Sequence, residues 1–244
     1  MPPDAVDNTR QVLGYAASLG ASVAGAADLR TIDPLPSHGG LSLDAFRHAI
    51  SMAVGLPSSA VESISVDDPG VLYAWAYRTA NAALDVLALK VSALISGRGF
   101  LALAIPASMN LDQKRGIGHI SHKAVAWAAG LGWIGRNGLL VNPTYGPRLR
   151  LVTVLTDMPM VCGSPINCRC GDCRLCVDSC PSNALRYVDF DVRPPSREAI
   201  FDLQRCASRL NAMKSMLERQ QASAPFAATV CGMCIRSCPY GRSR

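Results

Sequence analysis

The sequence has 244 residues, of which 49% are hydrophobic, 17% charged and 6% aromatic. This composition excludes a disordered chain, and the length is ample for a buried core without disulfide bonds. No run approaches the ~18 uninterrupted apolar residues of a membrane span, and residues 1–10 lack the basic and apolar regions of a secretory signal. We therefore expect a cytoplasmic protein that does not bind a membrane.

The net charge of +6 is unevenly distributed along the chain. Residues 1–160 hold 12 Lys and Arg against 11 Asp and Glu, whereas residues 161–244 hold 12 against 7. A basic C-terminal part suits an acidic partner, such as RNA or an electron-donor protein. The alternative is that the arginines balance the charge of deprotonated cysteines. We favour this alternative because there is no Lys/Arg block and no stacking aromatic series.

Hydrophobic periodicity predicts alternating helices and strands over the first 160 residues. Gly20 ends the first helical pattern, and the Pro, Gly and Ser content of residues 31–43 predicts a loop. This alternation predicts an α/β or α+β fold in which helices cover a central sheet. The predicted helices are 7–19, 71–95 and 121–129, and the predicted strands are 21–27, 48–56, 100–105, 139–141 and 149–155.

The composition changes at Cys162, because all ten cysteines lie there or later. A secreted disulfide scaffold would not segregate its thiols in this way. Pro194 and Pro195 precede a helical pattern, which predicts a helix over 196–220. We therefore predict two domains, covering residues 1–160 and 161–244.

The spacing of the cysteines predicts iron–sulfur clusters. The first run reads C-x2-C-x2-C-x3-C-P from Cys170 to Pro181. In this bacterial ferredoxin spacing, the fourth cysteine ligates the other cluster. The second run, C-x2-C-x3-C-P from Cys231 to Pro239, lacks one cysteine, and Cys206 is available to replace it.

Exchange of the cysteines before proline divides the eight thiols between two [4Fe–4S] clusters. The first cluster takes Cys170, Cys173, Cys176 and Cys238, and the second takes Cys180, Cys206, Cys231 and Cys234. Zinc is the alternative, but it prefers pairs of C-x2-C, which the triple spacing does not match. The two remaining cysteines, Cys162 and Cys168, are expected to be spectator thiols.

Residues 119–160, followed by these cysteine runs, resemble the epoxyqueuosine reductase family and its iron–sulfur relatives. The matching segments are AGLGWIGRN at 129–137, LLVNPTYG at 139–146, LTD at 155–157 and DLQRCASRL around Cys206, with a weaker match in YAW at 73–75. The resemblance implies a nitroreductase-like α/β domain over residues 1–160, followed by a two-cluster ferredoxin-like domain over residues 161–244. It also extends to the corrinoid module of reductive dehalogenases.

The same resemblance implies a function. Family members bind cobalamin in the N-terminal domain, and electrons pass from the two clusters to the corrinoid, which deoxygenates the epoxide of a modified tRNA base. FMN is the alternative second cofactor. A ferredoxin-type or flavodoxin-type protein is the expected electron donor, and the substrate is a small molecule or tRNA.

The AGLGWIGRN segment is the predicted cofactor-binding loop. Its glycines let backbone amides approach a planar group, while an indole covers an apolar face and a guanidinium holds a polar edge. The alternative is a tight helix-to-strand connection. The predicted cofactor-binding residues are Gly130, Gly132, Trp133, Gly135, Arg136 and Asn137.

The sequence departs from the tRNA enzymes at the expected proton donor. The acidic residue of the family aligns without gaps with Gly116, and the nearest acid is Asp112. His122 and Lys123 are further candidates, since histidine donates protons near neutral pH. The alternative is that they are polar residues following an N-cap at Ser121.

Three functions follow from these patterns. The first is an oxidoreductase with another substrate than tRNA, which the departure at Gly116 and the lack of a helical-repeat extension favour. The second is an electron carrier that docks a partner enzyme. The third is a tRNA epoxyqueuosine reductase. A Rossmann nicotinamide site has no support, because no G-x-G-x-x-G follows a predicted strand.

Overall fold

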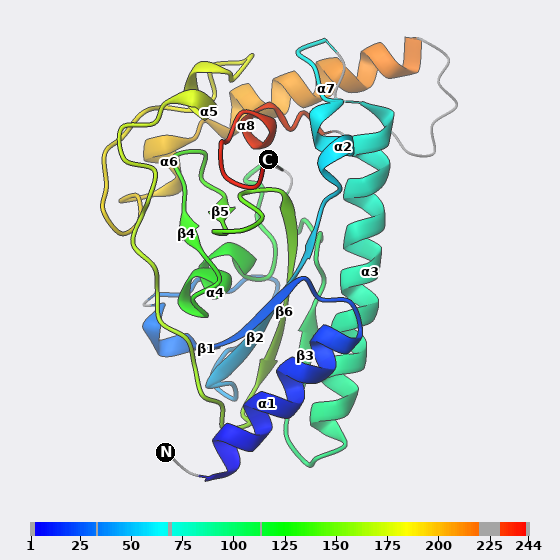
Figure 1. Cartoon of the computed structure of the whole chain (residues 1–244), viewed down its shortest axis with the longest axis vertical. Helices are drawn as coiled ribbons and strands as arrows, with labels where there is room; N and C mark the ends of the chain where they lie inside the picture. Colours follow the sequence, from blue (N-terminus) through cyan, green and yellow to red (C-terminus); the bar gives the residue numbers. More distant parts are fainter. Residues whose placement is uncertain (1–2, 33, 68–69, 113, 220–229, 243–244) are drawn as a thin grey trace. The chain divides into compact units, whose positions relative to one another are not determined.

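A four-stranded sheet forms the centre of the N-terminal part in the computed structural model, which describes residues 3–32, 34–67, 70–112, 114–219 and 230–242. The strand order is β1-β2-β6-β3 (Figure 1), and the outer pairs β1–β2 and β3–β6 are antiparallel. Each strand lies within two residues of its predicted position. The bounds are Val23–Asp28 for β1, His48–Gly55 for β2, Ala102–Ile105 for β3 and Leu149–Thr156 for β6.

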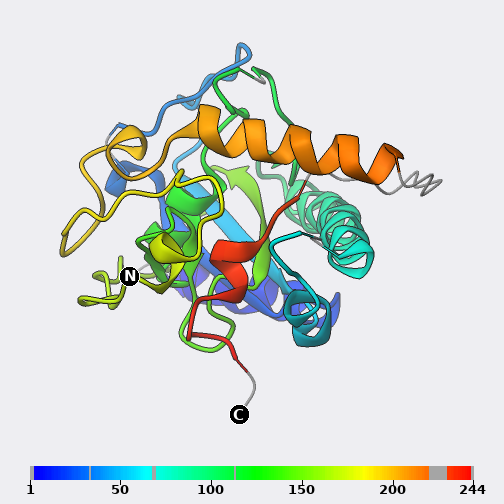
Figure 2. The ribbon, with the colours of Figure 1, turned by 90° about the horizontal axis from the view of Figure 1, so that it is seen from above.

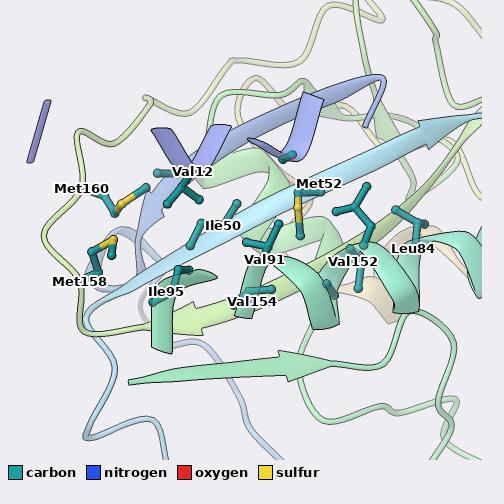
Figure 3. Packing of buried hydrophobic residues seen from close by; sticks show 14 of the residues in the cluster. Val12, Ile50, Met52, Leu84, Val91, Ile95, Val152, Val154, Met158 and Met160 are labelled. Atoms are coloured by element: carbon teal, nitrogen blue, oxygen red, sulfur yellow. The ribbon is translucent and has the colours of Figure 1, made fainter. Parts of the chain in front are cut away.

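One face of this sheet is covered by helices α1 (Pro3–Ser18) and α3 (Val71–Ser96). The apolar stripe of each helix packs against alternate residues of the strands, as Figure 3 shows for Val12 of α1, Val91 of α3 and Met52 of β2. All three side chains are completely buried. This packing confirms the helical patterns predicted for the first 100 residues.

Helix α3 also has the length and apolarity that a membrane span requires, by composition alone. Several of its apolar residues, including Leu84 and Ile95, are completely buried in the core around the sheet.

The opposite face of the sheet is covered by α4 (His122–Ala128), beside the short helix η1 (Leu29–Thr31). Thr153 of β6 points to this face because its neighbours Val152 and Val154 point to the other. The N-cap of α4 is Ser121, whose hydroxyl accepts a hydrogen bond from the Ala124 N–H at 3.3 Å. Sequence spacing predicted both this helix and its cap.

The C-terminal part consists of short elements around the cysteines. The hairpin β4–β5 joins Trp133–Ile134 to Leu140–Val141. Helix α5, which carries the third cysteine of the first run, packs against α8 of the second run (Figure 2). The helix bounds are Ser58–Glu62 for α2, Leu175–Asp178 for α5, Arg197–Ile200 for α6, Leu203–Arg219 for α7 and Met233–Arg236 for α8.

The single helix predicted over 196–220 is wrong in one respect, because the structure has two helices there, α6 and α7. Phe201 is extended and forms an isolated β-bridge with Leu185. The Asp202 N–H then donates to the Ala184 carbonyl at 2.8 Å, which takes the backbone out of the helical pattern. Residue 220, the predicted end, lies outside the described residues.

The chain groups into two compact units, each assembled from three segments. Two segments from the N-terminal part, 55–80 and 133–149, pack with the cysteine-rich residues, whereas the prediction placed a single boundary near residue 160. The separate roles predicted for residues 1–160 and 161–244 remain predictions. The first unit is Met1–Val54, Asn81–Gly132 and Arg150–Ile166, and the second is Gly55–Ala80, Trp133–Leu149 and Asn167–Arg244.

Candidate metal centres

Four thiols from both cysteine runs line one cavity of the second unit, and we call them the first thiol group: Cys170, Cys173, Cys176 and Cys238. A turn closed by the Cys173 N–H on the Cys170 carbonyl, at 3.1 Å, brings the first two thiols together. Cys176 lies on α5, and Cys238 follows α8, which packs against α5. These are the four thiols that the exchange rule predicts for the first cluster.

The pKa values of these thiols differ because their surroundings differ. Burial raises the pKa of Cys176 to about 12 and that of Cys238 to about 11. The pKa of Cys170 is instead lowered to about 6, above all by a hydrogen bond with the Cys168 side chain. The backbone N–H of Arg136 and the indole of Trp133 lower it further, against the effect of burial. Cys170 is therefore disposed to carry the negative charge of a metal ligand.

The remaining four cysteines of the predicted set lie within electrostatic reach of one another, and we call them the second thiol group: Cys180, Cys206, Cys231 and Cys234. Burial, and then the charges of Cys231 and Cys180, raise the pKa of Cys206 to about 11. Burial also raises the pKa of Cys234, and the charges of Cys231, then of Cys176 from the first group, and then of Cys206 and Cys180 add to the effect. Helix α7 thus brings Cys206 within electrostatic reach of thiols from both runs.

Cys180 differs from the rest of its group because backbone N–H groups donate hydrogen bonds to its sulfur. The Ala184 N–H donates to its Sγ at 3.3 Å. Burial raises the pKa of Cys180, but this bond and that of the Ser182 N–H outweigh it, so the pKa is lowered overall.

The donor sets favour clusters over single ions. The first cysteine run supplies its thiols as the triple C-x2-C-x2-C, whereas structural zinc takes pairs of C-x2-C. Two groups of four thiols, without nitrogen or oxygen donors, are the ligands that [4Fe–4S] clusters take. The residues present therefore fit two such clusters.

Arg136, a predicted cofactor-binding residue, forms hydrogen bonds with the loop of the first cysteine run. Its Nη2 donates to the Gly171 carbonyl at 3.0 Å, between two thiols of the first group, and to Asp189 Oδ1 at 2.5 Å. Its Nη1 donates to the Val188 carbonyl, and the guanidinium lies 5.0 Å from the centre of the Tyr187 ring. The side chain is only 3% exposed, and it joins the loop at Gly171 to the loop at residues 188–189 inside the protein.

Asn137 ties the same hairpin to the second cysteine run. Its Nδ2 donates to the Cys234 carbonyl at 3.3 Å, and its Oδ1 accepts from the Leu139 N–H at 3.1 Å. Gly135 leaves room for this arrangement, because a Cβ there would lie 2.7 Å from the Val141 side chain and 2.9 Å from Asn137 Oδ1. The predicted loop therefore holds both cysteine runs.

The other residues of the predicted cofactor-binding loop also face protein. Gly130 has a φ of +73°, and a Cβ there would lie 2.8 Å from the Ser164 carbonyl oxygen. Gly132 and Trp133 are buried. The loop therefore packs as a tight connection between helix α4 and strand β4. Contact of the loop with a second cofactor remains a prediction, and its packing does not support it.

A second glycine turn, in the LLVNPTYG segment, supports the C-terminal end of the second run. The Asn142 Oδ1 accepts from the Tyr145 N–H at 3.0 Å and so shapes the turn. Gly146, with a φ of +57°, lies directly against the Tyr240 carbonyl, and Gly241 lies against the Tyr145 carbonyl. Only glycine permits such mutual backbone contact.

His122 has protein partners at both ring nitrogens. Nε2 lies 3.0 Å from the Pro106 carbonyl, which only accepts, so this nitrogen carries the proton. Nδ1 then accepts from the Thr153 hydroxyl at 2.8 Å. Burial lowers the pKa of His122, which favours the neutral ring. A role as proton donor remains a prediction, and these contacts describe a structural histidine.

The other two candidate proton donors lie on the first unit. Lys123 follows His122 in the first turn of α4 and is partly buried. Asp112 lies in a separate tight turn, where its carboxylate accepts from the Arg115 N–H at 3.0 Å. Gly116 of that turn has a φ of +58°, in the left-handed region.

Arg148 also joins separate segments of the second unit. It is 1% exposed, and its Nη2 donates to Glu62 Oε1 at 2.6 Å and to the Arg236 carbonyl at 3.4 Å. Arg236 lies between two cysteines of the second run. Sequence spacing gives no signal for this contact, because Glu62 lies 86 residues away.

Comparisons with known proteins also indicate two iron–sulfur clusters. Residues 169–241 match the family model described as a 4Fe-4S double cluster binding domain. The epoxyqueuosine reductase of Staphylococcus aureus is 33% identical over 148 residues, which cover 59% of this chain and 37% of that protein. The enzyme of Bacillus subtilis is 31% identical over 128 residues, covering 52% and 31%. The chain thus spans about a third of the length of these relatives.

Solved structures share the mixed α/β fold. A catabolic reductive dehalogenase has a TM-score of 0.72 at 20% identity, covering 99% of this chain and 33% of that chain. The epoxyqueuosine reductase of Streptococcus thermophilus has a TM-score of 0.59 at 22% identity, covering 96% and 66%. The resemblance to epoxyqueuosine reductases and their iron–sulfur relatives is therefore confirmed, and the chain is similar in fold to both kinds of enzyme.

Proposed function

We propose that this protein is an iron–sulfur oxidoreductase in which two [4Fe–4S] clusters deliver single electrons to a second cofactor and a substrate bound by residues 1–160. The grouping of eight cysteines into two sets of four carries this proposal. The match of residues 169–241 to a double cluster domain supports it independently. A ferredoxin-type or flavodoxin-type protein supplies the electrons.

The chain's own residues hold the clusters and shield them. Arg136 fixes the loop of the first run, and Asn137 fixes the loop of the second. Burial of Cys176 and Cys238 excludes water from part of the first cluster site. When bound, the clusters supply one-electron transfer.

The second cofactor in this proposal is a corrinoid, with FMN as the alternative. One solved relative by fold is described as a reductive dehalogenase whose structure suggests a mechanism for B12-dependent dehalogenation. A nitroreductase-like layout of residues 1–160, in a cytoplasmic protein, belongs to the same proposal. The inward packing of Gly130 and Trp133 argues that the cofactor binds elsewhere than at the AGLGWIGRN loop.

Titration of the cluster-loaded protein with cob(II)alamin and with FMN tests this assignment. We expect saturable binding of cob(II)alamin near one equivalent, read from its absorption spectrum. Replacement of Trp133 by Phe serves as a control that changes the predicted loop and is expected to leave corrinoid binding intact. Binding of neither cofactor would favour the alternative function, an electron carrier that docks a partner enzyme.

The substrate in this proposal is not the tRNA epoxide. A solved epoxyqueuosine reductase is described in complex with a tRNA stem loop that carries epoxyqueuosine. In this chain, Gly116 occupies the place of the family's acid, and the carboxylate of Asp112 is engaged within its own turn. Opening of an epoxide needs a proton donor within hydrogen-bond reach of the departing oxygen.

We therefore expect that the gene fails to restore queuosine in a bacterial strain that lacks epoxyqueuosine reductase. The Staphylococcus aureus enzyme is the positive control in the same strain. Mass spectrometry of nucleosides from total tRNA gives the result. Restored queuosine would contradict the proposal and would make Asp112 or His122 the candidate proton donor.

A further inference from the structure

Helix α3 is apolar on the face that points away from the sheet as well as on the face that packs against it. Its 26 residues include only three charged side chains: Arg78, Asp85 and Lys90. Leu84 and Val91 lie on the inner face, where they are completely buried in the core around the sheet. A helix that is apolar all round is ordinarily buried all round. On the outer face, however, Leu72 and Leu89 are 65% and 66% exposed.

The exposed side chains of the outer face recur with the spacing of a coiled-coil seam. Successive members are three and four residues apart in turn, which is the a and d spacing of a heptad repeat. The gaps read 3-4-3-4-3, an order that is the same in both directions along the helix. None of these six exposed positions is charged, and we call them the α3 seam: Leu72, Trp75, Thr79, Ala82, Val86 and Leu89.

A seam with this symmetric spacing is complementary to its own copy in the antiparallel direction. In a two-fold dimer, each contact is made twice, with the roles of the two copies exchanged. Leu72 then faces Leu89 of the second copy, and the other members of the seam pair inward in order. At the centre, Thr79 faces Ala82 of the second copy, and these two short side chains allow the helices to approach closely.

The charges beside the seam favour the same register. Arg78 directly precedes Thr79, and Asp85 directly precedes Val86, so both occupy the same flanking position of the heptad. These positions face each other in an antiparallel pair, which brings Arg78 of each copy opposite Asp85 of the other. Both side chains are exposed, and the Asp85 carboxylate is held by the Ala107 N–H, which donates to its Oδ1 at 2.8 Å. Charge complementarity therefore adds to the apolar contact.

We propose that this protein forms a two-fold symmetric dimer in which the α3 seam pairs antiparallel with the α3 seam of a second copy. The seam is about 26 Å long, at about 1.5 Å per residue, and a helix is about 10 Å wide. This strip is smaller than the ~800 Å² that each partner buries in a stable interface, so the dimer dissociates on dilution. The seam contains no cysteine, and dimerisation therefore does not depend on the clusters.

Sedimentation velocity of the full, cluster-loaded chain over a range of concentrations measures the association. We expect the mass of one chain at low concentration and the mass of two chains at high concentration. Val86→Glu places a charge in the seam opposite Trp75 of the second copy, and we expect it to raise the dissociation constant more than about tenfold. Val86 is 53% exposed, so this variant is expected to fold and to load iron as the unmodified protein does.

The matched control variant is Val6→Glu on α1. Val6 is also an exposed helical valine, at 46% exposure, and it lies outside the seam. We expect this control to keep the dissociation constant of the unmodified protein. An equal rise in the control would overturn the inference, because the added charge and not the seam would then govern association.

Charge reversal tests the antiparallel register. Arg78→Glu alone or Asp85→Lys alone places like charges opposite each other, and either variant is expected to weaken the dimer. The two substitutions together restore opposite charges and are expected to restore association. In a parallel pair, Asp85 would instead lie opposite Lys90 of the second copy. The double variant would then stay weakened, and this result would overturn the antiparallel pairing.

The mass of one chain at every concentration, with both clusters loaded, would overturn the inference and leave the proposed function standing. Binding of the unmodified protein to vesicles of phosphatidylcholine and phosphatidylglycerol, abolished by Val86→Glu, would overturn it in favour of a membrane surface as the partner of α3. If Val86→Glu fails to fold, the charge-reversal variants decide the question. Absence of clusters from the unmodified protein would instead contradict the proposed function alone.

Discussion

Arg136 and Asn137 show at the residue scale what a sequence motif can and cannot predict. The glycines around them indicate a close backbone approach. The structure contains that approach, but the partners are the cysteine loops at Gly171 and Cys234. A glycine pattern does not specify what approaches the backbone, because the partner lies 35 or more residues away in the chain.

Cys206 is the opposite case, since it stands alone in the sequence and its place could still be predicted. The exchange rule leaves one ligand missing, and Cys206 is available between the two runs. In the structure, its thiol lies within the electrostatic reach of Cys231 and Cys180. Its role as a ligand is a prediction that one substitution can test.

We predict that Cys206→Ala halves the iron content, from about eight to about four atoms per chain, because one cluster loses a ligand while the other keeps all four. Anaerobic iron analysis and electron paramagnetic resonance measure the loss. Cys162→Ala, which changes a thiol outside both groups, is the control and is expected to retain about eight. Retention of both clusters in Cys206→Ala, with unchanged spectra, would show that Cys206 is not a ligand.

At the scale of elements, the sheet could be predicted because its strands are short apolar runs bounded by Gly or Pro. Strand β5 lies within the strand predicted over 139–141, whereas its partner β4 was not predicted, since it has only two residues and shows no periodicity. Helices α5 and α8 have four residues each and lie within the cysteine runs, where ligand spacing masks any apolar pattern. The division between α6 and α7 depends on the bridge from Phe201 to Leu185, a tertiary contact.

The turns also illustrate how elements far apart in sequence depend on each other. Gly146 follows a turn shaped by Asn142, and Gly241 follows the second cysteine run. Each glycine lies against the carbonyl of the tyrosine before the other. The sequence marks both positions as glycine, but only the structure shows that they require each other.

At the scale of the whole molecule, the fold class and the change of composition near Cys162 were predictable. The interleaving of segments was not. Residues 55–80 and 133–149 belong with the cysteine-rich unit, through contacts such as that of Arg148 with Glu62 and that of Asn137 with Cys234. Long-range hydrogen bonds of this kind leave no periodic trace in the sequence.

The central claim is that the second unit holds two [4Fe–4S] clusters, and anaerobic iron and acid-labile sulfide analysis of the full chain tests it most directly. Two groups of four thiols predict about eight iron atoms and about eight sulfides per chain. Stoichiometric zinc without labile sulfide would contradict the account.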